Sequence, residues 1–255
     1  MRGLRAAIRL QFQIFRSDPD YFMPLAVTPL LTIVFLEVVR HADRSDLTPY
    51  AVMAPVLIAL WQLALMNSGE VVEGDRGQGT LELGVAAPTP YATVVLGRVL
   101  AVASIALLAF LEVWIVAWAV FGVTVDVNHP AGFVIAMVAT AFATAGTATI
   151  MASLFVVTRS PRTFQNSLSY PFYVLGGVLV PASFLPDWLE PLSSVIFLSW
   201  SADLLRATLA TGPIEDFALR VSVVLVLGAA GYAIGFALLA RMLRRARRAG
   251  SLALV

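Results

Sequence analysis

Two residue types are missing from this chain of 255 residues. It contains no cysteine and no lysine, because all 17 basic residues are arginine. Without cysteine the chain can form no disulfide, no thiolate metal site and no cysteine nucleophile. Without lysine it cannot contain a P-loop, whose lysine reaches the phosphates of a bound nucleotide, or a Schiff-base lysine.

Charged residues are scarce. They make up 13% of the chain, whereas 59% of the residues are hydrophobic, and a soluble domain usually carries about 25% charged residues. This composition leaves too little polar surface to cover a soluble globule. It therefore excludes a soluble enzyme and a disordered chain, and it indicates an all-α integral membrane protein that crosses the bilayer several times.

The positions of the charges divide the chain into apolar stretches. A membrane span needs roughly 20 mostly apolar residues, and six stretches meet this requirement. The stretch Pro191–Ala202 is apolar but too short to cross, so we expect it to be re-entrant or interfacial. The six predicted transmembrane helices are Tyr21–Val39, Leu47–Gly69, a segment from Arg98 to about Val123, Pro130–Thr158, Thr163–Pro186 and Val221–Ala240.

The arginines predict the orientation. An even number of spans puts both termini on one side, and the positive-inside rule assigns the arginine-rich side to the cytoplasm. With both termini cytoplasmic, only Arg40, Arg44, Arg206 and Arg220 lie outside, where acidic residues dominate the loops. We therefore expect a multi-pass protein of the plasma membrane of a bacterium, with both ends inside.

The two ends of the chain are basic. Residues 1–18 are expected to form an amphipathic helix at the inner membrane interface, with arginines on one side and apolar residues on another. Asp18-Pro19 ends this helix, and the six-span domain 19–255 follows. The C-terminal Arg241–Arg248 cluster directly follows a span, so we expect it to contact membrane lipids rather than nucleic acid. The only histidines, His41 and His129, are isolated in outer loops, so we expect no metal site and no catalytic residues.

The cytoplasmic connection 70–90 has an unusual pattern. Acidic residues precede a lone Arg76, and a glycine-rich turn then leads into a short apolar segment that two prolines end. Thr80 stands where it can cap a short helix that begins at Leu81. An ordinary solvated loop is the alternative interpretation. The residues that carry the pattern are Glu73, Arg76, Gly77, Gly79, Thr80, Leu81, Glu82, Ala87 and Pro88.

This pattern resembles the cytoplasmic motif of ABC-2-type transporter permeases, in particular the small drug- and antibiotic-export permeases of the daunorubicin-resistance kind. The family commonly has Glu-Arg directly before the glycine region, whereas Gly74-Asp75 separates Glu73 from Arg76 here. A second block resembles the family's fifth span and the short outer re-entrant helices after it. This block spans 176–206, with the outer re-entrant region at 181–206, and it is marked by Pro181, Pro186, Trp188 and the closing Arg206.

The resemblance implies the permease subunit of an ATP-driven exporter. Segment 70–90 would then be a coupling helix against a separate ATPase, with Glu73, Arg76, Gly79, Thr80, Leu81, Glu82 and Pro88 at the contact. Two permease subunits, identical or homologous, would pair with two ATPase subunits. ATP and magnesium would bind to the ATPases, so this chain itself is expected to hold no cofactor and to be no enzyme.

The spans also suggest a substrate path. Apolar and aromatic walls favour an amphipathic or hydrophobic substrate, such as a drug, an antibiotic, a lipid or a lipid-linked glycan. A carboxylate within a span is costly, so Glu112 either serves the substrate or a proton, or bonds a neighbouring helix. A secondary transporter or channel without an ATPase, and a membrane scaffold without transport, are the alternatives. The candidate path residues are Trp61, Glu112, Phe164, Phe172 and Tyr173.

Overall fold

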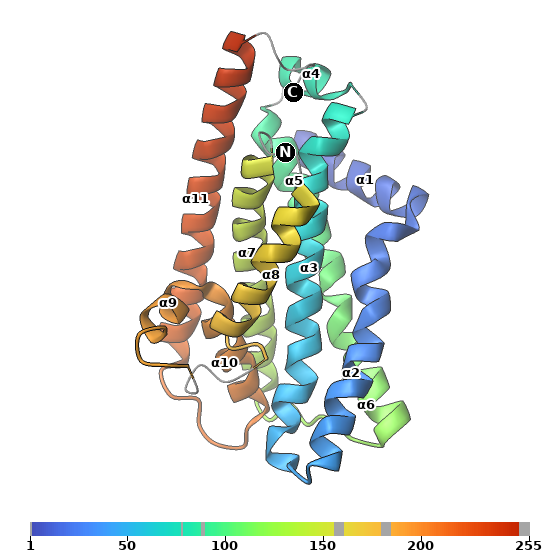
Figure 1. Ribbon diagram of the computed structural model, residues 1–255, viewed down its shortest axis with the longest axis vertical. Helices are drawn as coiled ribbons and strands as arrows, with labels where there is room; N and C mark the ends of the chain where they lie inside the picture. Colours follow the sequence, from blue (N-terminus) through green and yellow to red (C-terminus); the bar gives the residue numbers. More distant parts are fainter. Residues whose placement is uncertain (1, 78, 88–89, 156–160, 180–184, 250–255) are drawn as a thin grey trace.

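A computed structural model of the chain describes residues 2–77, 79–87, 90–155, 161–179 and 185–249. Within these residues every regular element is a helix. The long helices stand side by side as a bundle, and shorter helices cover its two ends (Figure 1). One end carries α1 (Arg2–Ser17), α4 (Leu81–Ala86) and the last turns of α11 (Phe217–Ala249), and the other carries α9 (Glu190–Val195) and α10 (Phe197–Leu209).

Five segments of the described chain are long and apolar enough to cross a membrane. They involve α2 (Met23–His41), α3 (Thr48–Gly77), α5 (Tyr91–Ala106) with α6 (Leu108–Phe121), α7 (Pro130–Phe155) and α11. The predicted fifth span, 163–186, only overlaps α8 (Pro161–Leu175), which has 15 residues and is not among these five segments. Residues 180–184 of that span lie outside the described part, so the arrangement of six spans stays a prediction.

The N-terminal helix lies across one end of the bundle (Figure 1). Asp18 ends it by accepting a hydrogen bond from the Asp20 backbone N–H at 3.1 Å, and Pro19 then begins a 3-10 turn. Because proline fixes φ and lacks an N–H, it suits the first turn of a new helix but not the interior of the old one. The chain therefore turns at this point into the first span.

The third span differs from its prediction in two ways. Its helix begins at Tyr91 rather than at Arg98, so Arg98 lies inside α5 and is 3% exposed. The charge of Arg98 predicts the boundary of the span, but a buried partner described below allows this residue to lie inside the helix. The helix also breaks at Leu107, the residue that separates α5 from α6.

Helix α3 forms the centre of the bundle. It packs against α2, α5, α6, α7, α8 and α10, and Val56, Leu57, Leu60 and Leu63 on it are completely buried. Its 30 residues extend past the predicted span end at Gly69 as far as Gly77. The first part of the 70–90 connection is thus a continuation of the helix rather than a loop.

Glycines bring α7 and α11 into close contact. A Cβ added at Gly231 would lie 2.8 Å from the backbone carbon of Gly146, and one at Gly235 would lie 2.7 Å from that of Thr149. Ser153 reinforces the contact, because its hydroxyl donates to the Gly235 carbonyl at 2.7 Å. The small residues of these two helices therefore allow close packing inside the bundle.

Candidate functional site

A polar junction joins three helices at the end of the bundle that carries α4. We call it the Asp75–Arg98 junction, and it consists of Gln11 on α1, Val71 and Asp75 on α3, and Tyr91 and Arg98 on α5. Arg98 Nη1 lies 2.7 Å from Asp75 Oδ1, and Arg98 Nε donates to Gln11 Oε1 at 2.7 Å. Arg98 Nη1 also donates to the Val71 carbonyl at 3.3 Å, and the Tyr91 hydroxyl donates to Asp75 Oδ2 at 2.8 Å.

Burial makes the junction structurally important. The Arg98 side chain is 4% exposed and that of Asp75 is 19% exposed. A buried guanidinium is tolerated only when its charge and its N–H groups find partners. Here one carboxylate, one amide and one backbone carbonyl supply them. The end of α3 is thereby tied to α1 and α5 through charge-assisted hydrogen bonds, which are stronger than neutral ones.

A glycine allows α1 to reach this junction. A Cβ added at Gly97 would lie 2.7 Å from Ala7 Cβ and 3.0 Å from the Leu4 carbonyl oxygen. A side chain at residue 97 would therefore push α1 away from α5. Because Gly97 precedes Arg98 directly, the same close approach brings Gln11 within reach of the guanidinium.

Helix α4 is attached to the junction by the turn before it. Gly79 has φ of 67°, a left-handed conformation that suits glycine, and the Thr80 N–H donates to the Asp75 carbonyl at 2.8 Å. The expected capping by the Thr80 side chain is wrong, because its hydroxyl donates to the same Asp75 carbonyl at 3.1 Å instead. Gly84 on α4 faces the Tyr91 ring, whose carbons would lie 3.2 Å from an added Cβ.

The sequence motif and the junction overlap only in part. Of the predicted coupling residues, Gly79 and Thr80 adjoin Asp75, while the side chains of Glu73, Arg76, Leu81 and Glu82 lie outside the described part of the structure, as does Pro88. The sequence motif does not include Asp75, Arg98, Gln11 or Tyr91 as contact residues. The signal that the sequence offers is an aspartate and an arginine on either side of one connection in a chain with few charges.

The aromatic path candidates meet between α3 and α8. The Trp61 ring stacks on Phe172 with centroids 4.3 Å apart, and Trp61 Nε1 donates to Ser169 Oγ at 3.4 Å. Trp61 and Tyr173 are both buried, at 2% and 5% exposure. The next turn of α8 exposes Tyr170 to 72%. The Phe164 side chain lies outside the described residues.

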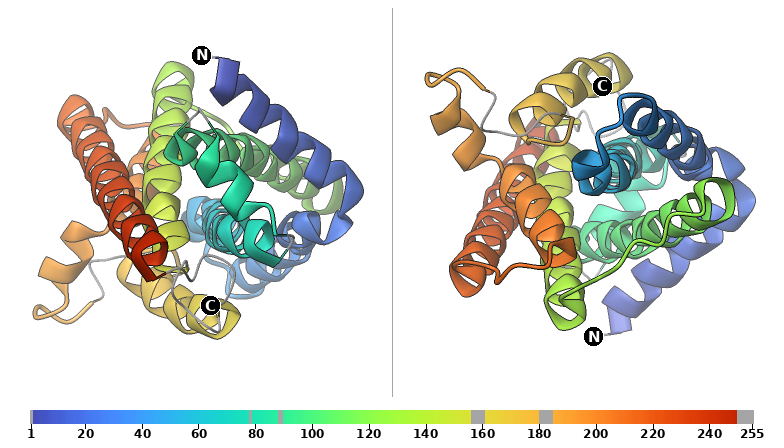
Figure 2. Two further views of the ribbon diagram at one scale, coloured as in Figure 1. Left: turned by 90° about the horizontal axis from the view of Figure 1, so that it is seen from above. Right: turned by 90° about the horizontal axis from the view of Figure 1, so that it is seen from below.

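Glu112 is separate from these aromatic residues. It belongs to α6, which packs on α2 and α3 on the other side of α3 from α8 (Figure 2). Its side chain is half-buried, and its Oε2 atom has no hydrogen-bond partner among the described residues. The structure thus does not join Glu112 and the aromatic pair into one site.

Arg206 is a buried arginine that connects several segments at the opposite end of the bundle. The side chain is 6% exposed, and its Nη2 donates to the Gly177 carbonyl at 2.7 Å and to the Val178 carbonyl at 3.1 Å. The guanidinium also lies 4.1 Å from the centroid of the Tyr50 ring. Arg206 thereby ties α10 to the chain after α8 and to the start of α3. Burial lowers the pKa of this guanidinium, and Asp203 at 3.6 Å opposes that shift.

Two other residues predicted to mark this outer region lie on the surface. Trp188 is 73% exposed, and Pro186 is exposed beside it. An exposed indole with one polar atom suits the headgroup layer of a membrane. Pro181 lies outside the described residues.

Comparison with known proteins identifies one family. The family described as "ABC-2 type transporter" matches residues 2–210, most of the chain. The matched range includes the Asp75–Arg98 junction, helix α4, the aromatic pair and Arg206. No curated protein matches the chain.

Proposed function

The chain belongs to the ABC-2 type transporter family, and from this premise we propose that it is the permease subunit of an exporter driven by a separate ATPase. The family assignment makes it a multi-pass membrane protein and a transport subunit that associates with an ABC ATPase. The observation that carries the coupling role is the Asp75–Arg98 junction beside α4, in which Asp75 of α3 pairs with Arg98 of α5 and Arg98 in turn bonds Gln11 of α1.

Force from the ATPase would enter through segment 70–90. Its second helix, α4, follows a turn in which the Thr80 N–H bonds the Asp75 carbonyl, and Asp75 holds Arg98. A push on α4 would therefore reach α3 and α5 together. Because α3 is one continuous helix from Thr48 to Gly77, the displacement would be carried into the membrane toward Trp61 and Phe172.

The cargo we propose is amphipathic or hydrophobic. The exposed Tyr170 on α8 offers an aromatic ring with a hydroxyl group rather than a charge, and the stacked rings of Trp61 and Phe172 are also uncharged. Drugs, antibiotics, lipids and lipid-linked glycans share this chemistry. Glu112 remains a candidate for a cationic group on such a cargo, because a carboxylate within a span is costly unless it meets a partner.

The working assembly would contain two permease subunits, identical or homologous, and two ATPase subunits that bind ATP and magnesium. The apolar stretches predict six spans per permease, and the arginine distribution predicts cytoplasmic termini. The arrangement of the helices supports this orientation. The basic helix α1, the basic last turns of α11 and the proposed coupling helix α4 all lie at the same end of the bundle (Figure 1).

The test compares transport per ATP hydrolysed in vesicles that contain the permease and its ATPase. Arg76→Gln and Glu82→Gln remove charges from the proposed contact, and losing one member of a buried charge pair at an interface costs roughly 2–5 kcal/mol. We therefore expect about a tenfold or greater loss of ATPase co-purification, or hydrolysis without export, at normal expression.

Asp43→Asn and Asp216→Asn at the other end of the bundle are the matched controls. Both aspartates have positive φ, of 52° and 50°, a conformation that asparagine tolerates better than alanine. The controls should keep the wild-type ratio. Equal, near-normal ratios in both sets with the ATPase still bound would exclude this segment as the coupling element. Export by the permease alone, driven by an ion gradient, would favour the secondary transporter.

A further inference from the structure

The outward side of α1 is both basic and apolar. Arg5, Arg9 and Arg16 are exposed along one stripe of the helix, and Leu10 and Phe12 are each 42% exposed. The other side of α1 is buried, with Ala7 at 3%, Gln11 at 0% and Phe15 at 3% exposure. Packing against the bundle therefore explains why one side of α1 is apolar and buried. It does not explain why the exposed side carries three arginines.

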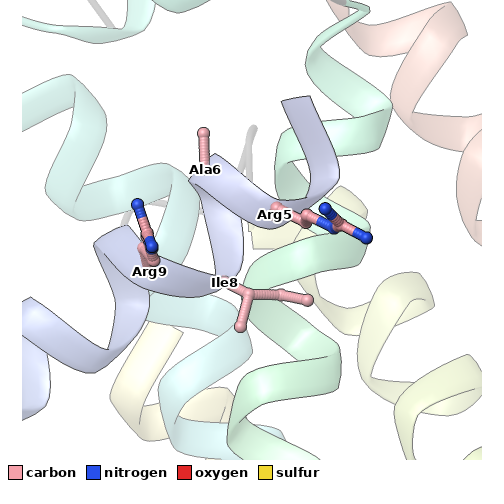
Figure 3. A pocket seen from close by; sticks show the side chains of 4 residues that line it. All are labelled: Arg5, Ala6, Ile8 and Arg9. Atoms are coloured by element: carbon pink, nitrogen blue, oxygen red, sulfur yellow. The ribbon is translucent and has the colours of Figure 1, made fainter. Parts of the chain in front are cut away.

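Two of these arginines border an open pocket. Its volume is about 520 Å³, and the described residues that line it are Arg5, Ala6, Ile8 and Arg9. Figure 3 shows Arg5 and Arg9 on successive turns of α1 with Ile8 between them. The site thus combines two cationic groups with an apolar wall.

The charges of Arg5 and Arg9 are not balanced by the protein in the part of the chain that the structure describes. Neither guanidinium forms an ion pair there, whereas Arg98 and Arg206 each have an aspartate partner. Residues at i and i+4 of a helix have Cβ atoms roughly 5–6 Å apart. Figure 3 shows the two side chains extending in different directions, so both must turn toward one point to donate to the oxygens of a single phosphate group, which planar arginine forks suit.

The position of α1 favours an anion that belongs to the membrane. The helix lies across the end of the bundle, and the first candidate span begins at Pro19, directly after it (Figure 1). Its side chains are therefore at the depth of the lipid headgroups. A soluble phosphate would bind the arginines but would not contact Ile8, Leu10 or Phe12. A phospholipid would bind the arginines through its phosphate group and contact the apolar side chains through its acyl chains.

We propose that Arg5 and Arg9 bind the phosphate group of an anionic glycerophospholipid, whose acyl chain lies against Ile8 in the pocket. The lipid is a structural ligand on the outward side of α1. It seats the helix at the inner leaflet while Gln11, on the inward side, contacts Arg98. This site is independent of the cargo path and of the proposed export activity.

The experiment measures lipid bound to the full-length protein in a non-ionic detergent by native mass spectrometry. The protein is titrated with phosphatidylglycerol or phosphatidylcholine. A basic residue near an anionic headgroup contributes about 1 kcal/mol, so we expect about a tenfold or greater preference for phosphatidylglycerol from two arginines. The double variant Arg5→Gln/Arg9→Gln should lose this preference while eluting as a single species like the wild type.

The double variant Arg40→Gln/Arg44→Gln, which removes the same net charge, is the control. Both arginines are exposed at the end of the bundle opposite to α1 and neither lines the pocket, so this variant should retain the preference. An equal loss in the two double variants would overturn the proposal, because diffuse charge would then explain the binding. Displacement of the lipid by millimolar inorganic phosphate would also overturn it, since a soluble anion would then be the ligand.

Discussion

At the scale of single residues, Asp75 and Arg98 show how the chain accommodates Arg98, one of the two buried arginines in the part that the structure describes. Taking an ion pair out of water costs several kcal/mol per ion, so such a pair is retained only where its geometry is good. Contacts of 2.7 Å to Asp75 and to Gln11 meet this condition. The carboxylate also accepts from the Tyr91 hydroxyl at 2.8 Å.

We predict that removing either partner alone destabilises the protein more than removing both. Asp75→Leu leaves a buried guanidinium without its counter-ion, a loss of roughly 3–5 kcal/mol, whereas an apolar pair at the same place is often near neutral. Asp75→Leu combined with Arg98→Met should therefore be more stable than Asp75→Leu alone. Unfolding of the four members of this mutant cycle in detergent gives the coupling energy.

The exposed pair Arg44–Asp46 provides the comparison. Its atoms are as close, at 2.8 Å, but its side chains are 58% and 59% exposed. Exposed pairs contribute about 0–1 kcal/mol, so Asp46→Asn should shift the unfolding transition little. If this variant lost as much stability as Asp75→Leu, burial would not explain the importance of the junction.

The junction could not be predicted from local sequence. Asp75 and Arg98 lie 23 residues apart, and Gln11 lies 87 residues from Arg98, so no helical or strand periodicity relates them. Segment 70–90 can be recognised in the sequence because its turn residues and charges are contiguous. Arg98 and Gln11 come close to Asp75 only through the packing of helices that are far apart in the sequence.

At the scale of helices, α7 and α11 depend on small residues for their contact. A Cβ at Gly228 would lie 2.7 Å from Ala143 Cα, and one at Gly146 would meet the Gly228 carbonyl. Between helices in a lipid environment no hydrophobic force favours association, so close backbone packing contributes most of the attraction.

We predict that Gly231→Val destabilises the bundle, whereas Ala230→Val does not. The first variant places two methyl groups where the Gly146 backbone already lies within 2.8 Å of an added Cβ. The neighbouring Ala230 is exposed on the same helix, so its variant controls for the β-branched side chain. Thermal unfolding in detergent should show a lower midpoint for Gly231→Val only. Equal midpoints would mean that α11 moves aside at little cost.

Hydropathy predicts the spans well and their ends poorly. The stretches around α2, α3, α7 and α11 follow from the absence of charge over about 20 residues, and the helices cover them. The break at Leu107 has no proline or glycine beside it, so nothing in the local sequence marks it. The predicted start of α5 is wrong because a charge is expected to be solvated, whereas Arg98 is buried and pairs with Asp75 of α3.

At the scale of the molecule, the structure groups the chain's connections at two ends. Residues 42–44, 122–129 and 210–216 lie at the end opposite to α1 and α4 (Figure 1). In a membrane these two groups of segments face opposite compartments. Most arginines lie at the α1 end, so the positive-inside rule assigns that end to the cytoplasm.

We predict that reporters fused at Val255 and at Asp126 fall on opposite sides of the membrane. Fluorescent-protein activity should appear at Val255, and alkaline phosphatase activity at Asp126. A third fusion, at Asp43, should match Asp126. A C-terminus outside the cell would contradict both the orientation and the cytoplasmic position of segment 70–90.

The length of α3 relates a displacement at one end of the helix to a smaller one in its middle. Pro55 removes one backbone hydrogen bond within this helix, and Asp75 lies 20 residues, or about 30 Å, farther along its axis. Trp61 lies only about 9 Å beyond the same proline. If α3 turns about Pro55, a displacement of about 3 Å at Asp75 moves Trp61 by about 1 Å. A displacement at the cytoplasmic end of α3 would thus move the Trp61–Phe172 stack by about a third as much.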